Sequence, residues 1–173
     1  MMILVTGGVR SGKSTHAEKL MADAQSVTYV ASGPIPDGTD EEWSARIAAH
    51  QERRPVNWST VESGDLASAV EGKQVVLIDD LGTWVTAMVD DMAGWKRPFE
   101  RWRAEFDRRV AEAVTAVSAT QTAVIVTNEV GMGVVPDHAS GRLFRDLLGT
   151  VNQRFAVACD EVHLVVSGRV LKL

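Results

Sequence analysis

The chain has 173 residues, which suits one compact domain with a full core and leaves little room for two. Hydrophobic residues make up 45% of it and charged residues 24%, as in ordinary water-soluble globular proteins. The net charge of −5 disfavours binding along a nucleic-acid backbone, and the single cysteine, Cys159, excludes an internal disulfide and suits the reducing cytoplasm.

Short apolar runs alternate with helical stretches, which is the pattern of parallel β-α-β units. In chain order the sequence first predicts a strand at 2–5, a glycine-rich turn, a helix at 13–24, a strand at 27–31 and a helix at 41–52. A short strand at 57–61 and a strand at 75–78 follow, and then a Met- and Trp-rich helical run that is broken by Gly94 and Pro98. The last predicted elements are a helix at 99–119, a strand at 123–127, a helix at 141–158 and a strand at 162–166. The apolar runs are too short for a signal peptide core or a membrane span. We therefore expect one cytoplasmic domain, residues 1–173, with no membrane span.

A phosphate-binding motif follows the first predicted strand. The pattern G-x-x-x-x-G-K-[ST] is matched in full by Gly7, Gly8, Val9, Arg10, Ser11, Gly12, Lys13 and Ser14. The glycines allow a turn in which successive backbone N–H groups face phosphate oxygens, and the following helix adds its positive N-terminal end. We expect Lys13 to reach the β- and γ-phosphates and the Ser14 hydroxyl to ligate Mg²⁺.

The motif and the alternating pattern together predict the fold class. It is α/β: a RecA-like P-loop NTPase fold of three layers, with an open, mostly parallel sheet and helices on both faces. In such a sheet ligands gather at the carboxyl ends of the strands, where the phosphate-binding motif also lies.

A carboxylate at the end of another buried strand would complete a metal site. Asp79 follows the strand at 75–78, and Asp80 is a further candidate for a base. Either aspartate could instead cap the helix that comes next. We favour the metal role for Asp79. In proteins with this phosphate-binding motif, Mg²⁺ is held by the hydroxyl of the motif, here Ser14, together with an aspartate at the end of another strand.

More polar side chains end the strand at 123–127. Thr127, Asn128 and Glu129 should face the same crevice as the phosphate-binding motif. The apolar, glycine-rich segment 130–136 follows them. This segment could close over a bulky apolar substrate, or it could merely turn the chain.

The predicted helix at 41–52 carries a basic group of residues. Arg46, His50 and Arg53 or Arg54 have the spacing that places side chains on one helix face. Guanidinium groups beside an imidazole would suit a triphosphate, and a neutral imidazole could attack phosphorus. From spacing alone, however, a solvated basic face is the simpler interpretation.

Taken together, these segments resemble adenosylcobinamide kinase/adenosylcobinamide-phosphate guanylyltransferase. The resemblance is carried by residues 1–14, Arg46, Ile47, His50, Arg54, Pro55, 127–136 and 144–154. It spans essentially the whole chain, and the stretch 128–133 combined with the phosphate-binding motif is highly specific. The chain departs from the common family pattern at Gln51, Asp80, Gly82 and Ala87, which bear on corrinoid placement and nucleotide preference.

The resemblance implies a bifunctional enzyme of cobalamin assembly. Such an enzyme phosphorylates adenosylcobinamide with ATP or GTP. It then forms a histidine–GMP intermediate from GTP, releases pyrophosphate, and transfers GMP to adenosylcobinamide phosphate, giving adenosyl-GDP-cobinamide. The resemblance assigns the nucleophilic histidine to His50, and it implies a homotrimer.

The resemblance also implies a set of nucleotide contacts. Besides the phosphate-binding motif, these are Ala31, Ser32, Gly33, Gln51, Glu52, Arg53, Arg54, Glu62 and Asp79. Two other functions would use the same motif: a small-molecule kinase without guanylyl transfer, which leaves His50 without a role, and a nucleotide-sensing module without turnover. GTP labelled at the α-phosphate distinguishes the three.

Overall fold

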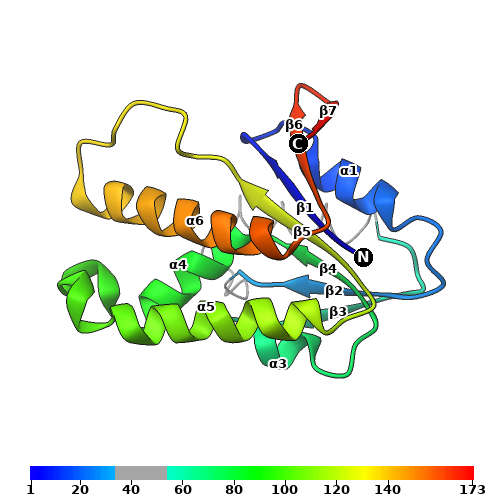
Figure 1. Cartoon of the computed structure of the whole chain (residues 1–173), viewed down its shortest axis with the longest axis horizontal. Coiled ribbons are helices and arrows are strands. Elements are labelled where there is room, and N and C mark those ends of the chain that lie inside the picture. The colour runs from blue at the N-terminus through cyan, green and yellow to red at the C-terminus, as the bar shows by residue number, and fades with distance from the viewer. Residues whose placement is uncertain (34–53) are drawn as a thin grey trace.

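A seven-stranded sheet organises the computed structural model, which describes residues 1–33 and 54–173 (Figure 1). The strand order is β3-β2-β4-β5-β1-β6-β7, and every pairing is parallel except that of β6 with β7. The strands are β1 Met2–Gly7, β2 Val27–Ala31, β3 Trp58–Glu62, β4 Val75–Asp79, β5 Thr122–Asn128, β6 Glu161–Val166 and β7 Arg169–Lys172. The predicted α/β class, with its open and mostly parallel sheet, is confirmed.

Helices cover both faces of the sheet, and the strands alternate their side chains between the two layers. Helix α1 lies on one face of the sheet, and α3, α4, α5 and α6 lie on the other (Figure 1). In β1, Ile3 and Val5 pack in the same cluster as Ala17 of α1, whereas Met2 and Leu4 pack in the cluster of the other four helices. The helices are α1 Lys13–Leu20, α3 Leu66–Val70, α4 Leu81–Asp91, α5 Arg103–Ser118 and α6 Ala139–Ala158, with 3-10 turns at Gly94–Lys96 and Phe99–Arg101. None of the helices in this part of the chain combines the length and apolar composition that a membrane span needs.

Several predicted boundaries are wrong. The first helix ends at Leu20 rather than at 24. The long helix predicted from residue 99 begins only at Arg103, because Trp102 leaves the helical conformation with φ −131° and packs its buried ring on Phe99. The sequence analysis also missed α3 and the last strand, β7. The helix predicted at 41–52 lies outside the described residues.

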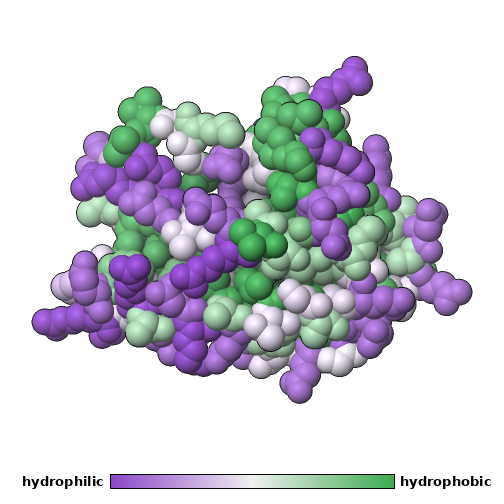
Figure 2. Space-filling view, viewed as in Figure 1, coloured by the Kyte–Doolittle hydropathy of each residue, from purple (hydrophilic) through white to green (hydrophobic). Residues whose placement is uncertain are grey.

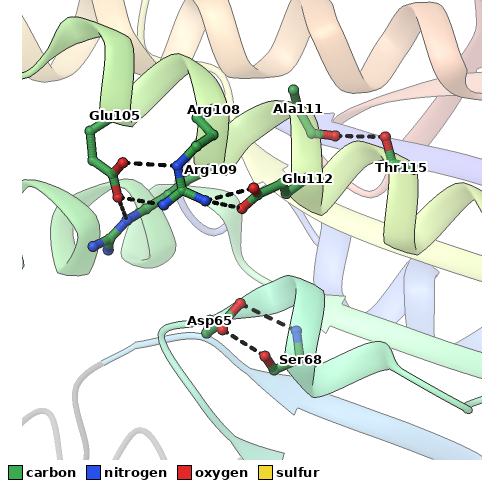
Figure 3. Close-up of polar contacts among 8 residues, drawn as sticks. All are labelled: Asp65, Ser68, Glu105, Arg108, Arg109, Ala111, Glu112 and Thr115. Atoms are coloured by element: carbon green, nitrogen blue, oxygen red, sulfur yellow. Dashed lines mark hydrogen bonds and ion pairs between the residues drawn. The ribbon is translucent and has the colours of Figure 1, made fainter.

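Helix α3 is too short to be stable by itself, and a side-chain cap holds its first turn. Asp65 accepts hydrogen bonds from the Ser68 backbone N–H at 3.2 Å and from the Ser68 hydroxyl at 2.7 Å (Figure 3). These hydrogen bonds, the one from the Ser68 hydroxyl first, lower the pKa of Asp65 below its usual value. The cap is therefore strongest while the carboxylate is ionised.

We expect Asp65→Ala to reduce the free energy of unfolding by about 1 kcal/mol at pH 7, the usual effect of losing an N-cap. Because the pKa of Asp65 is lowered by folding, this stabilisation is present above the unfolded pKa of about 4 and is lost as the pH falls through the folded pKa. Urea denaturation at pH 7 and pH 3 measures the difference. Asp65→Asn is the matched control, since asparagine caps about as well without a charge. An alanine variant as stable as the unaltered chain at pH 7 would contradict the capping role.

Candidate functional site

The phosphate-binding loop leaves the end of β1 and enters α1, as the motif predicts. Gly7 pairs with Asn128 of β5, and a Cβ atom there would collide with the Val165 carbonyl oxygen, so only glycine fits. Gly12 stands directly before the first turn of α1 with φ 95°, a conformation that favours glycine. The loop thus turns tightly around the N-terminal end of α1, where backbone N–H groups can bind an anion.

Lys13 lies across this loop. Its side chain is buried, and its Nζ donates a hydrogen bond to the Gly8 carbonyl oxygen at 3.3 Å. Ser14 is half-buried in the same turn of α1, and Val9 and Arg10 are exposed. The hydroxyl oxygen of Ser11 is buried without a hydrogen-bond partner among the described residues, an unusual state for a polar atom. A bound phosphate would give such a hydroxyl an acceptor.

The ends of three neighbouring strands align beside the loop. Ala31 of β2 stands opposite Asp79 of β4 on one side and opposite Glu62 of β3 on the other. Three of the residues that the resemblance implies as nucleotide contacts therefore share one edge of the sheet. Gly33 continues from β2 at the same edge, beyond the buried Ser32.

Asp79 has a partner that the sequence did not indicate. The Tyr29 hydroxyl donates a hydrogen bond to Asp79 Oδ2 at 2.8 Å, and the Arg54 guanidinium stacks 3.4 Å from the centre of the Tyr29 ring. Burial first, and the Asp79 charge second, raise the pKa of Tyr29 far above its usual range, so its hydroxyl remains a donor at all ordinary pH values. Tyr29 thereby joins Asp79 and Arg54 in one cluster.

Asp80 caps helix α4, the role that the sequence analysis allowed for either Asp79 or Asp80. Its carboxylate accepts a hydrogen bond from the Thr83 backbone N–H at 2.8 Å at the start of α4. Burial, followed by repulsion from Asp79, raises the pKa of Asp80. The Ser32 hydroxyl, fully buried, donates to the Asp80 carbonyl oxygen at 2.7 Å. Ser32 therefore anchors the end of β2 to the start of α4.

Asn152 of α6, which the sequence analysis did not single out, forms hydrogen bonds to the end of β5. The Asn152 side chain accepts a hydrogen bond from the Thr127 hydroxyl at 2.6 Å and donates one to the Asn128 carbonyl oxygen at 3.1 Å. The Glu129 backbone N–H donates to the Gly7 carbonyl oxygen at 3.0 Å. The strand-end residues Thr127, Asn128 and Glu129 thus adjoin the phosphate-binding loop, as predicted.

The segment 130–136 is an open apolar loop. Met132 is 79% exposed and Val134 95% exposed, so the loop is not packed into the core. Figure 2 shows apolar surface over this loop at the upper left and over the β6–β7 hairpin at the upper right, with the surface hollowed between them. The loop therefore presents apolar side chains at the surface, directly after the strand-end residues of β5.

Several predicted site residues lie outside the described residues. They are Arg46, His50, Gln51, Glu52 and Arg53. Arg54, the first described residue after them, donates from Nη1 to the Thr60 hydroxyl at 2.9 Å and stacks on Tyr29. Arg54 is therefore linked to Asp79 through Tyr29.

The residues that were predicted to hold Mg²⁺ fit that ion chemically. Ser14 offers a hydroxyl oxygen and Asp79 a carboxylate, and Mg²⁺ prefers such oxygen ligands together with phosphate oxygens and water. The Tyr29 hydroxyl orients Asp79 by its hydrogen bond to Oδ2. An orienting hydrogen bond of this kind is usual behind a metal-binding carboxylate.

Comparisons with known proteins agree with this geometry. A family model described as cobinamide kinase / cobinamide phosphate guanyltransferase matches residues 3–173. Proteins named bifunctional adenosylcobalamin biosynthesis protein CobU from Escherichia coli and Salmonella typhimurium are 43% and 42% identical, over 100% of this chain and 99% of theirs. The protein named CobP from Pseudomonas aeruginosa is 33% identical over 97% of this chain and 94% of its own.

A solved structure resembles the fold alone. It is an ATPase from a bacterial type III secretion system, with a TM-score of 0.60 and 13% sequence identity. The match covers 94% of this chain and 50% of the ATPase chain, so this chain spans about half the length of that one. The likeness confirms the P-loop NTPase type of fold that the motif predicted.

Proposed function

The chain belongs to the cobinamide kinase/cobinamide phosphate guanyltransferase family, and on that premise we propose how its residues divide the two reactions. It is a bifunctional transferase that phosphorylates cobinamide and then transfers a guanylyl group to the phosphate so formed. The observation that carries the assignment of roles is the tight loop between β1 and α1, with Lys13 folded across it. One triphosphate cradle would serve both reactions.

In the kinase step the acceptor is the aminopropanol hydroxyl of adenosylcobinamide, and the donor is ATP or GTP. The hydroxyl oxygen forms a bond to the γ-phosphorus and releases its proton to water, and the bond from that phosphorus to the β-phosphate oxygen breaks. Lys13 and the N-terminal end of α1 offset the charge on the β- and γ-phosphates. Ser14 and Asp79 would hold Mg²⁺, which supplies further charge neutralisation when bound.

In the guanylyl step we assign the nucleophile to His50. A neutral imidazole nitrogen attacks the α-phosphorus of GTP, and pyrophosphate leaves into the cradle of the loop and Lys13. A phosphate oxygen of adenosylcobinamide phosphate then attacks the same phosphorus, and the bond from phosphorus to His50 breaks. The products are adenosyl-GDP-cobinamide and free His50.

The other contacts follow the edge of the sheet. Ala31, Gly33 and Glu62 would line the nucleoside, and Arg54, with Gln51, Glu52 and Arg53 before it, would lie near the phosphates. Ser32 supports this edge rather than the ligand, because its hydroxyl is buried and bonded to the Asp80 carbonyl oxygen. We further propose that the enzyme is cytoplasmic and a homotrimer and that nucleic acid is not a partner.

GTP labelled with ³²P at the α-phosphate tests the proposal. Incubation of the chain with this GTP and Mg²⁺, without a corrinoid, should give protein-bound label that is stable in base and labile in acid, as phosphoramidates are. Addition of adenosylcobinamide phosphate should then discharge the label into product. A chain that transfers γ-phosphate to cobinamide but takes up no α-label would be a kinase only. A chain that does neither would be a sensing module.

A further inference from the structure

The C-terminal hairpin is formed by β6, the turn at Ser167 and Gly168, and β7. It contacts the phosphate-binding loop at one point and the first turn of α1 at another. The Gly168 backbone N–H donates a hydrogen bond to the Ser11 carbonyl oxygen at 2.8 Å. Deeper in the hairpin, His163 Nδ1 lies 2.9 Å from Nε2 of His16, which belongs to α1. The two rings are tilted by 43° with centroids 5.1 Å apart, so the contact is a hydrogen bond between their edges rather than a stack.

His163 is the middle of a directed chain of hydrogen bonds. The residue is 1% exposed. Its Nε2 lies 2.7 Å from a carboxylate oxygen of Glu161, which also accepts a hydrogen bond from Lys172 Nζ at 2.8 Å. The hydrogen bonds from Lys172 and then from His163 lower the pKa of Glu161, so this carboxylate is ionised and accepts. In the tautomer that donates from Nε2 to Glu161, Nδ1 of His163 is the acceptor that faces His16.

The partner of that nitrogen sits in the first turn of α1. His16 follows Lys13 by three residues, and its backbone N–H donates to the Gly12 carbonyl oxygen at 2.9 Å. Burial is the largest cause that lowers the pKa of His16, so its ring is neutral at pH 7 and can donate a hydrogen bond from Nε2 to His163. The hydrogen bond to His163 therefore fixes, through one rigid helical turn, the place from which the Lys13 side chain starts.

A buried histidine is commonly no more than a satisfied core residue. Here the hydrogen bond joins two segments 147 residues apart, and one of them carries the phosphate-binding lysine. His163 also stands directly opposite Lys172 in the β6–β7 pairing, so the whole hairpin braces the contact. The hydrogen bond therefore links the hairpin to the helical turn that begins with Lys13, which packing in the core alone would not require.

We propose that His163 is a positioning residue for the triphosphate, which acts through its hydrogen bond to His16 and thereby fixes Lys13 and the first turn of α1. The proposal rests on the assignment of Gly7–Ser14 as the triphosphate site. Since one cradle serves both reactions, both should depend on His163 through nucleotide affinity. The maximal rates at saturating nucleotide should change little, because bound phosphate restores the order of the loop.

A matched pair of amides tests the proposal. Asparagine places its amide oxygen where His163 Nδ1 lies and keeps the acceptor for His16, whereas glutamine reaches toward Glu161 and loses it. Affinity for the α,β-methylene analogue of GTP, which cannot be cleaved by attack on the α-phosphorus, is measured by calorimetry without a corrinoid. We expect Kd to rise about tenfold in His163→Gln and less than about twofold in His163→Asn, the effect of one lost hydrogen bond. Equal Kd values in the two variants would overturn the proposal, whatever their melting temperatures.

A double-mutant cycle guards against a variant that folds poorly. His16→Ala alone should raise Kd about as much as His163→Gln does, and His163→Gln added to His16→Ala should raise it no further. Additive losses would show that His163 does not act through His16 and would refute the proposal. If the unaltered chain fails to bind the analogue at all, the assignment of the triphosphate site is wrong. If it binds and the variants do not differ, only the role of His163 is wrong.

Discussion

Replacement of Lys13 by methionine should lower kcat/KM about 10³-fold in both reactions, the loss expected when a cation on the transferring phosphates is removed. The buried Lys13 side chain lies across the loop with its Nζ at the Gly8 carbonyl oxygen. Methionine has a similar length and no charge, so it fills the space without contacting phosphate. Transfer of γ-phosphate to adenosylcobinamide and of GMP to adenosylcobinamide phosphate are the two measurements.

Lys19→Met is the matched control for this change. Lys19 lies on the same helix, α1, and is exposed in its last turn, so its replacement should leave both rates within about twofold. The melting temperature of each variant, measured beside the two rates, separates loss of chemistry from loss of fold. If Lys13→Met retained either reaction at the unaltered rate, the two steps would not share one cradle.

The features of the fold that could be predicted from the sequence are those with a local cause. The phosphate-binding loop is specified by the spacing of Gly7, Gly12 and Lys13, and the structure places it between a strand and a helix, as expected. The buried strands are apolar runs, and β2 occupies the predicted residues. The cap formed by Asp80 was foreseen only as an alternative, because an aspartate before a helix and an aspartate beside a metal look alike in sequence.

The last strand was missed although a signal for it existed. Ser167 and Gly168, with φ 50° and 75°, form a two-residue turn directly after the valine-rich strand β6. This arrangement is typical of a β-hairpin. The strand itself, β7, is exposed at every residue, so it lacks the apolar run that marked the others.

Other parts of the site depend on contacts between distant segments. Tyr29 bonds to Asp79, which lies 50 residues away, and His16 bonds to His163, which lies 147 residues away. Neither histidine carries a sign of the other in the sequence. They meet because β6 pairs with β1, which leads into the helix that carries His16. Sequence periodicity describes one element at a time, so it carries no signal for such pairs.

Replacement of His50 by alanine should abolish the guanylyl step and spare the kinase step. Without the imidazole there is no atom to accept GMP, so protein-bound α-label should vanish and GMP transfer should fall by about 10³-fold or more. Phosphoryl transfer from the γ-position does not use this nucleophile and should change by less than about fivefold. His138→Ala is the control, because His138 is an exposed histidine at the N-cap of α6, and its loss should leave the label in place.

A second variant distinguishes a lost nucleophile from a distorted site. His50→Gly leaves space for a ring, and guanosine 5′-phosphorimidazolide supplies GMP already bonded to an imidazole nitrogen. If His50 is the nucleophile, this compound should restore GMP transfer to adenosylcobinamide phosphate, with free imidazole as the leaving group. If His50 instead only positions GTP, the phosphorimidazolide should react no faster with the variant present than without it. Restored transfer would therefore assign the covalent step to His50 and leave Lys13 and the phosphate-binding loop as the part common to both reactions.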